Sequence, residues 1–285
     1  MRTSDLHVLR IRLRAAKGAT LPCLPTVALR SVVGMTLREL SCVQRDRSSC
    51  SGCPARDGCA YSQLLEPAGD ARSLGVTDVA PPPLVLAPEA RTLDEAPIRL
   101  ADGGWLDVRA VFFGRARAHA SLLVAAMRAG LARGVGRERV AMEVLEAQPV
   151  EVTLPSLGTA AELELWTPLR LVSQGKIRSR FTAQDFVQGL TRRVQVLSQV
   201  HGSGEELPPP TETPLDLECS DTRVVHVRRW SARQKAGMDL PGLMGRIVLR
   251  GDLSRLWPWL ALGEWVQVGK GTSMGFGRYR LRAVG

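Results

Sequence analysis

Residues 268–280 read VGKGTSMGFGRYR and place four glycines among cations, hydroxyls and an aromatic residue. Glycine permits positive φ and lets backbone N–H groups approach an anion closely. Lys270 and Arg278 add charge, and Thr272 and Ser273 add short hydrogen-bond donors. This composition is typical of a loop that holds phosphates. The alternative is an ordinary glycine-rich hairpin, and so short a motif does not by itself separate the two.

Outside this stretch, the composition predicts a globular and strongly basic protein. The chain has 285 residues, 45% of them hydrophobic, which suffices for one large domain or two of ordinary size. Lys and Arg number 38 against 28 Asp and Glu, so the net charge is +10 and a nucleic acid or another anionic surface is the favoured partner. We predict a cytoplasmic protein, because no apolar run is long enough to span a bilayer and the first residues alternate instead of forming a signal-peptide core.

The first half of the chain alternates between strand and helix patterns. Residues 6–15 alternate apolar and polar side chains, which is typical of a strand, and its polar face is cationic. Residues 26–42 place apolar side chains on one helical stripe, with Arg30 and Arg38 two turns apart. A cysteine-rich insert and a proline-rich connection from Ala80 onward follow. We then predict a strand over Trp105–Phe113, a helix over Ala116–Arg133 and a strand over Arg139–Val152.

The second half repeats this order. We predict strands over Leu163–Val172, Arg223–Trp230, Gly245–Arg250 and Trp265–Leu281, with helices over Thr182–Val200 and Leu253–Leu262. We read the first half as β-α-(insert)-β-β-α-β, with ranges for three of its four strands, and the second half as β-α-β-β-α-β, which predicts an α+β fold of two tandem ferredoxin-like (RRM-like) domains. We place the first domain at 1–155, with an insert at about 42–96. The second, 156–285, carries the glycine-rich loop 269–277.

Several linked motifs resemble one family. They comprise the stretch 230–235 (WSARQK), the stretch 240–245 (LPGLMG), Leu262-Gly263-Glu264 and the glycine loop, all in the family's order. The segments 29–42 and 53–67 are also similar. In these features the chain resembles the CRISPR precursor-RNA processing endoribonucleases, the sixth Cas family of the RAMP superfamily. The resemblance covers nearly the whole chain. It implies CRISPR repeat RNA as substrate, crRNA as product and other Cas proteins of an effector complex as partners.

The resemblance also implies a mechanism without metal. The RNA's own 2′-hydroxyl attacks the adjacent phosphate, which requires a proton acceptor, charge stabilisation and a donor for the leaving oxygen. Family members often carry a histidine on the first helix, but none lies between Thr26 and Cys42 here. We therefore predict Arg30, Arg38 and His7 as catalytic residues, although arginine is a poor base. A structural role for His7 is the alternative, as is a non-catalytic crRNA-binding subunit for the whole protein.

Four cysteines crowd one short region of the chain. Cys42, Cys50, Cys53 and Cys59 supply four thiols, and Cys50 and Cys53 have the CxxC spacing that wraps a tetrahedral zinc ion. The other two gaps are irregular. A structural zinc, an iron–sulfur cluster and free thiols are the alternatives, and none of these is needed for catalysis. A bound metal would stabilise an insert that has few apolar residues of its own.

Further cations and donors are candidates for contact with RNA. Clustered Lys and Arg give salt-dependent, sequence-blind affinity, while an Arg–Gln–Lys set can read a base edge and hold the backbone. A solvated surface is the alternative for each of them. The predicted RNA-binding residues are Arg233, Gln234, Lys235, Lys176, Arg178, Lys270, Thr272, Ser273 and Arg278.

Overall fold

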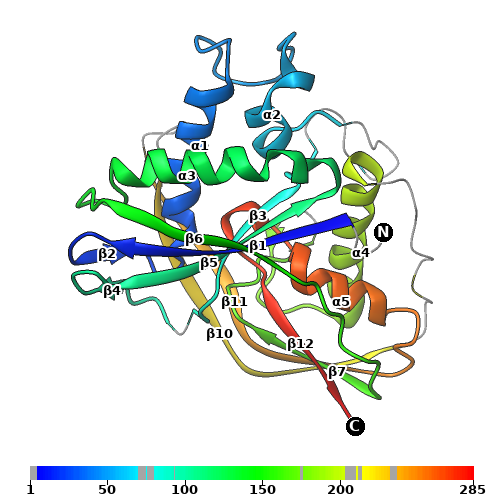
Figure 1. Ribbon diagram of the computed structural model, residues 1–285. Helices are drawn as coiled ribbons and strands as arrows, with labels where there is room; N and C mark the ends of the chain where they lie inside the picture. The colour runs from blue at the N-terminus through cyan, green and yellow to red at the C-terminus, as the bar shows by residue number, and fades with distance from the viewer. Residues whose placement is uncertain are drawn as a thin grey trace.

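A computed structural model describes residues 5–69, 75, 80–92, 94–173, 176–202, 210, 214–231 and 236–285, and arranges them around two four-stranded antiparallel sheets (Figure 1). The first sheet has the strand order β3-β5-β1-β6, and its helices follow the first and third of these strands along the chain. Its elements are β1 Leu6–Ala15, α1 Thr26–Ser41, β3 Leu84–Pro88, β5 Trp105–Phe113, α3 Ala120–Ala132 and β6 Met142–Val150.

The second sheet repeats the arrangement with the order β10-β11-β7-β12. If the four strands of each half are numbered along the chain, both sheets have the strand order 2-3-1-4, which is the ferredoxin-like topology. The predicted doubled ferredoxin-like fold is therefore present. Its elements are β7 Ala160–Leu165, α4 Ala183–His201, β10 Asp216–Ser231, β11 Ala236–Arg250, α5 Trp257–Val266 and β12 Tyr279–Val284. Short elements complete the list: β2 Ala19–Leu21, β4 Ile98–Leu100, α2 Ala60–Leu65, β8 Val172–Ser173, β9 Lys176–Ile177, and 3₁₀ turns at Arg56–Gly58, Gly114–His119 and Thr272–Met274.

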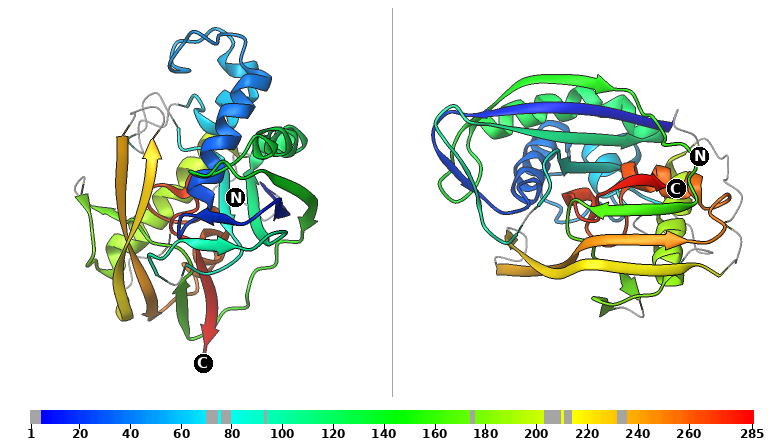
Figure 2. Two further views of the ribbon diagram at one scale, coloured as in Figure 1. Left: turned by 90° about the vertical axis from the view of Figure 1, so that its left-hand side faces the viewer. Right: turned by 90° about the horizontal axis from the view of Figure 1, so that it is seen from below.

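Alternation along β1 explains how the sheets bury apolar surface. Leu9, Ile11 and Leu13 belong to a core shared with α1 and α3, as the period of two requires. Leu6 and Val8 point to the other face and join a core with Leu163, Phe186 and other residues of the second half. Because this second core includes side chains from both sheets, the two halves pack on each other. Seen from below, the two sheets lie side by side (Figure 2).

The structure differs from the predicted elements at several ends. The last predicted strand, Trp265–Leu281, is wrong, because α5 continues through Val266 and β12 begins only at Tyr279. Gln267, with a φ of 62°, ends the helix, and the glycines after it form a loop with a short 3₁₀ turn. The strand predicted over Leu163–Val172 already ends at Leu165, and β10 and β11 are each longer than predicted.

Two further differences lie in the first half. The helix predicted from Ala116 begins at Ala120, after a 3₁₀ turn, and the strand predicted from Arg139 begins at Met142. Strand β3 had no alternating pattern in the sequence because all five of its residues are buried. Three consecutive prolines just before it also read as a connection. The predicted domain boundary at residue 155 stays a prediction.

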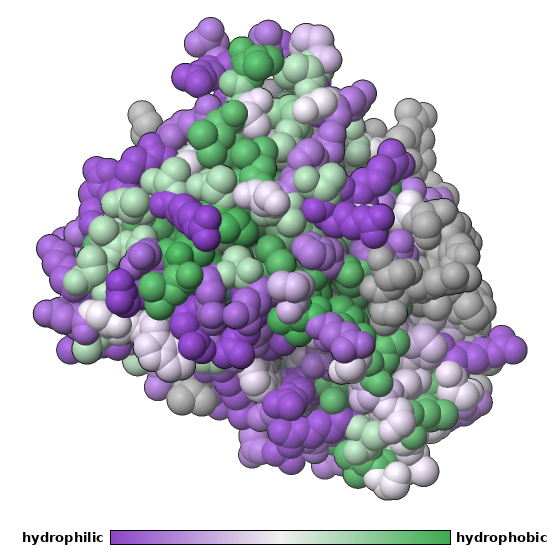
Figure 3. All heavy atoms as spheres, viewed as in Figure 1, coloured by the Kyte–Doolittle hydropathy of each residue, from purple (hydrophilic) through white to green (hydrophobic). Residues whose placement is uncertain are grey.

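No described helix is both long enough and apolar enough to cross a membrane. Polar side chains cover most of the face shown in Figure 3, with apolar patches between them.

The cationic side of β1 is organised by one carboxylate on β5. Asp107 is buried and accepts hydrogen bonds from Arg12 Nε at 2.8 Å and Arg10 Nη2 at 2.6 Å. Hydrogen bonds from Arg12 and Arg10, followed by the charges of both, lower the pKa of Asp107 despite the opposing effect of burial. The ionised carboxylate therefore stabilises the fold and holds two of the strand's cations in place.

We expect Asp107→Asn to lower the free energy of unfolding by about 1–2 kcal/mol at neutral pH, because both arginine partners remain partly exposed to water. The folded pKa lies below the ordinary value of 3.8, so this stabilisation is complete above about pH 5 and is lost as the pH falls through the folded pKa. Urea unfolding of both proteins at pH 7 and pH 3 checks this. A difference that grows at pH 3 would contradict it.

Candidate functional site

The glycine segment, residues 269–277, packs on the start of α1. Gly271 and Gly275 have φ values of 90° and 96°, which lie in the left-handed region that favours glycine. A Cβ on Gly275 would lie 2.5 Å from Thr26 Oγ1 and 2.7 Å from Leu86 O. Thr26 Oγ1 also donates a hydrogen bond to Met274 O at 2.8 Å. The glycines are therefore needed here for a close approach of the segment to α1 and β3.

An apolar cluster joins this segment to the β10–β11 pair as well. Val27 of α1, Val227 of β10, Leu240 of β11 and Phe276 of the glycine segment are all buried in one cluster. Figures 1 and 2 show the long β10–β11 pair extending from the second sheet to α1. We call the place where α1, β10 and the glycine segment meet the junction. It brings together elements that lie far apart in the sequence.

Two arginines converge at the junction. Arg30 of α1 and Arg229 of β10 lie close enough that, after burial, the charge of Arg229 is a main cause of the lowered pKa of Arg30. Both Nε atoms are buried, and neither has a hydrogen-bond partner within the described part of the chain. Gly34 leaves room for Arg30, since a Cβ there would lie 2.6 Å from Arg30 Nη1. Two partly exposed guanidinium groups, each with a buried Nε that lacks a partner in the described residues, form a suitable site for an anion such as a phosphate.

The Glu66 carboxylate, which is bound by Tyr61, offsets part of this charge. Tyr61 Oη donates to Glu66 Oε1 at 3.1 Å, and both groups raise the pKa of Arg30. Burial, followed by the charge of Glu66, raises the pKa of Tyr61 to about 12. The phenol is therefore protonated at neutral pH and can donate a proton but cannot accept one. Glu66 Oε2 also accepts a hydrogen bond from Cys50 N at 3.1 Å, which ties this carboxylate to the cysteine-rich loop.

Sequence reasoning missed Arg229. The signal was present, because Val225 and Val227 are buried on one face of β10 and Arg229 is the next residue on that face. Contact with the glycine segment is direct, since Arg229 Nη1 lies against Met274 Sδ. Only the packing of β10 against α1 shows that this arginine meets Arg30.

The predicted phosphate-binding residues of the glycine segment have different surroundings. Lys270 is exposed and Ser273 is partly exposed, so both can contact a ligand in solution. Thr272 is buried. Arg278 is also buried, with its guanidinium bound to Pro88 O and to Glu89 Oε2, the latter at 2.9 Å. Thr272 and Arg278 therefore shape the segment from within and present no free surface for a clamp.

Two other predicted RNA contacts, Lys176 and Arg178, lie outside the junction. Lys176 is exposed in β9, and Arg178 follows it with its N–H bonded to Leu171 O at 2.9 Å. Arg233, Gln234 and Lys235 lie outside the described residues. As RNA-binding residues, all of these stay predictions.

No described contact joins a histidine to Arg30 or Arg229. The predicted catalytic residue His7 lies beside the Phe112 ring at 5.9 Å. His119 Nε2 lies 2.7 Å from Gln63 Oε1, and burial lowers the pKa of His119. Burial also lowers the pKa of His201 to about 4, so this group is neutral at physiological pH. A catalytic role for His7 stays a prediction.

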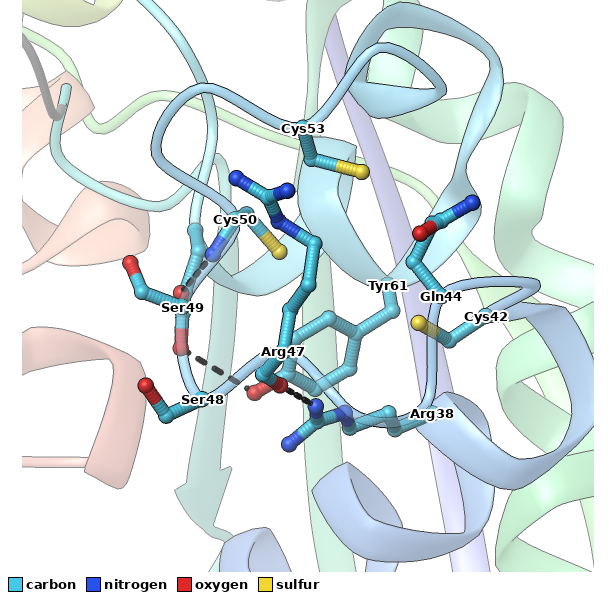
Figure 4. Close-up of a pocket in the computed structure, with 10 residues that line it drawn as sticks. Arg38, Cys42, Gln44, Arg47, Ser48, Ser49, Cys50, Cys53 and Tyr61 are labelled. Atoms are coloured by element: carbon cyan, nitrogen blue, oxygen red, sulfur yellow. Dashed lines mark hydrogen bonds between the residues drawn. The ribbon is translucent and has the colours of Figure 1, made fainter.

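Arg38 lies two turns further along α1, beside the cysteine-rich loop (Figure 4). Its Nη2 donates to the backbone oxygens of Arg45 and Arg47, and its guanidinium lies 5.9 Å from the centre of the Tyr61 ring. These contacts hold the loop against α1 and α2. The predicted catalytic role of Arg38 stays a prediction, whereas its contacts in the structure are with the loop.

Three of the four cysteines between residues 42 and 59 line the pocket shown in Figure 4. They are Cys42, Cys50 and Cys53, while Cys59 Sγ lies 3.7 Å from Ser41 O. Among the described residues, no three His, Cys, Asp or Glu side chains are positioned to hold a metal ion. The structural zinc stays a prediction from the CxxC spacing.

Comparisons with known proteins match both halves of the chain. A family model described as an N-terminal domain matches residues 4–162, and the model for CRISPR-associated endoribonuclease Cas6 matches residues 163–279. No curated protein matches this sequence.

Solved structures show the same architecture over nearly the whole chain. A Cas6 product complex is similar with a TM-score of 0.56 at 15% identity, covering 98% of this chain and 100% of that one. Thermus thermophilus Cas6 has a TM-score of 0.53 at 15% identity, with 98% of both chains covered. The product of a Cas6-related gene from Pyrococcus furiosus has a TM-score of 0.54 at 9% identity, with 97% and 98% covered. At these identities the likeness establishes the fold, and it confirms the doubled ferredoxin-like prediction.

Proposed function

We propose that this chain, as a member of the Cas6 family of CRISPR-associated endoribonucleases, binds CRISPR repeat RNA at the junction. We further propose that it cuts this RNA to produce crRNA. Two similar structures support RNA as the ligand. One is a Cas6 product complex, and the other is a RAMP protein that binds different RNA substrates. The net charge of +10 supports the same class of ligand.

The proposed reaction uses the RNA's own nucleophile. The 2′-oxygen attacks the adjacent phosphorus and gives up its proton, the bond to the 5′-oxygen breaks, and that oxygen takes a proton. The products are a 2′,3′-cyclic phosphate and a 5′-hydroxyl. Charge on the phosphate oxygens grows in the transition state, so fixed cationic donors beside them lower the barrier.

The arginine pair carries this proposal. Arg30 and Arg229 lie near enough for their charges to interact, and each has a buried Nε donor without a partner among the described residues. The repulsion between these like charges is offset when an anion binds to both of them. Holding both groups before the substrate arrives also favours the transition state, because no reorganisation is then needed. We assign them to stabilisation of the phosphorane and to orientation of the 2′-hydroxyl.

No described residue is assigned as the general base. Tyr61 carries a proton at neutral pH, but its raised pKa of about 12 makes it a weak acid, so no described residue is assigned as the donor to the leaving 5′-oxygen either. Arginine is a poor base at any physiological pH. Without a base, the reaction relies on charge stabilisation and positioning, and we expect slow cutting that depends on RNA structure.

The exposed cations suit retention of the product. Lys270 and Lys176 are both exposed, so they can bind backbone phosphates without taking part in chemistry. We propose that the protein stays bound to the crRNA within an effector complex with other Cas proteins. A non-catalytic crRNA-binding subunit is the second candidate function, favoured by the absence of histidine from residues 26–41 of α1.

Two substrates separate these functions. The protein is incubated in EDTA with its repeat RNA and with the same RNA carrying a single 2′-deoxy nucleotide at the cut site. We expect the first to be cut to a 2′,3′-cyclic phosphate product and the second to stay intact, because the nucleophile is gone. Binding of both RNAs with cutting of neither would favour the non-catalytic subunit, and cutting of the deoxy substrate would contradict the mechanism.

A further inference from the structure

A cavity of about 500 Å³ lies between the first sheet, α5 and β12. Its walls include Glu89 after β3, Arg109 of β5, the connection 150–155, Trp166 after β7, and residues 264–265 and 278–281. Figure 1 shows the connection after β6 passing in front of α5 and β12. We call this cavity the Trp166 pocket. Its volume lies within the range of about 300–1,000 Å³ that is usual for sites holding small molecules.

One carboxylate in the wall is shared by two arginines. Glu89 accepts hydrogen bonds from Arg109 Nε at 2.8 Å and from Arg278 Nη2 at 2.9 Å. Burial acts to raise the pKa of Glu89, but the charges of Arg278 and Arg109 outweigh it and lower this pKa. The ion-paired wall is therefore rigid and already ionised, and one acid balances two cations there.

Two buried donors at this wall have no partner in the described part of the chain. They are Arg109 Nη1 and Trp265 Nε1. The two groups are adjacent, since the Arg109 guanidinium lies 4.4 Å from the centre of the Trp265 ring. Unpartnered buried donors are costly unless a ligand or water accepts their hydrogen bonds. A ligand with acceptor atoms would satisfy both of them.

Beside the Glu89 wall, the pocket has an aromatic residue with two arginines over its ring. The Trp166 indole is only partly buried and is held by a hydrogen bond from Nε1 to Glu164 Oε2 at 3.2 Å. The buried Arg278 guanidinium lies 4.6 Å from the centre of this ring, and the guanidinium of the exposed Arg280 lies 5.7 Å from it. A planar base that takes the place of the Arg280 side chain on the indole can stack there while Arg280 binds a phosphate, as in proteins that bind single-stranded nucleic acids.

We propose that the Trp166 pocket binds one unpaired nucleotide of single-stranded RNA, with its base on the Trp166 indole and its phosphate on Arg280. This inference rests on the proposed function, because it adds a second contact for the same RNA. Arg278 connects the junction and the Trp166 pocket, since it follows the glycine segment in the chain and forms part of the pocket wall. A paired base is already stacked in its helix, so the pocket selects the single-stranded part of the RNA.

The test uses the full chain with fluorescein-labelled hexauridylate and hexaadenylate, which are single-stranded RNAs. We expect Arg280→Ala to weaken hexamer binding about tenfold, since stacking and phosphate contacts of this kind are worth that much or more. Arg250→Ala is the matched control, because Arg250 is also an exposed strand arginine but does not line the pocket. Its effect should be less than about twofold, the loss expected for one rim charge.

Ultraviolet crosslinking with peptide mass spectrometry locates the hexamer directly. We expect crosslinks at Trp166 or Trp265, and we expect Trp166→Phe to retain binding better than Trp166→Leu because it keeps an aromatic face. Equal losses for the Arg280 and Arg250 variants, or crosslinks confined to other regions, would overturn the proposal. Crosslinks at Trp166 in a protein that does not cut repeat RNA would support the nucleotide-binding pocket and contradict the proposed catalysis. Cutting of repeat RNA without such crosslinks would support the catalysis and contradict the pocket.

Discussion

Replacing Arg30 with alanine is expected to lower the rate of repeat-RNA cleavage by about 100-fold or more, the usual effect of removing one preorganised donor to a transition-state anion. The affinity for uncut RNA should fall much less, because exposed cations such as Lys270 still hold the backbone. Single-turnover cleavage and filter binding with a 2′-deoxy substrate measure the two quantities separately.

Two further variants show whether charge or geometry is responsible. Arg30→Lys keeps the charge but loses the planar fork, so we expect it to recover only a small part of the rate. Arg128→Ala removes an exposed cation from α3 and serves as the control for net charge. Equal losses of cleavage rate and RNA affinity in Arg30→Ala would show that Arg30 binds the RNA but has no separate role in catalysis. A normal cleavage rate in Arg30→Ala would show that the junction is not the site of cutting.

Gly275→Ala is expected to lower the free energy of unfolding by about 2–4 kcal/mol and to reduce cleavage strongly. The φ of 96° is unfavourable for alanine, and the added Cβ would lie 2.5 Å from Thr26 Oγ1 and 2.7 Å from a backbone oxygen. To accommodate the new atom, the glycine segment has to move away from α1. Arg229 then loses its contact with Met274, and the arginine pair loses part of its support. Urea unfolding and cleavage assays on the same preparation measure both effects.

Gly237→Ala is the matched control for this substitution. Gly237 lies in β11, a Cβ there would meet no heavy atom of the described residues within 4 Å apart from its chain neighbours, and its φ is not in the left-handed region. We expect a change in stability of no more than about 0.5 kcal/mol in this variant. Equal stability of the two glycine variants would show that the segment does not depend on its close approach to α1.

Periodicity was sufficient to predict most of the fold. Helix α1 and most of strand β1, from Leu9 to Ala15, bury one face, so their sequences carry the helical and two-residue patterns that identify them. Strand β3 is buried throughout and has no such pattern. The last strand was predicted too early because Trp265 and Val266 are apolar in a helix that is buried on all sides.

The candidate site was only partly predictable. Arg30 and the glycine segment could be proposed from the helical stripe and from the family motifs. Arg229 could not, because its importance depends on the packing of β10 against α1. The burial of Arg278 was likewise hidden, since its partner Glu89 lies almost 200 residues away in the chain.

Local periodicity and linked motifs are properties of neighbouring residues, so the sequence alone was enough to predict the doubled ferredoxin-like order, the basic charge and the family resemblance. Which cations lie together depends on tertiary packing. Arg30 and Arg229 converge because an apolar cluster of Val27, Val227 and Phe276 draws three distant elements together. The same packing buries Arg278 against Glu89 and leaves Arg280 exposed beside Trp166. Arg278 and Arg280 are two residues apart in the sequence but have different roles. The burial and the partners of a charged group, and not its residue type, determine what it can bind.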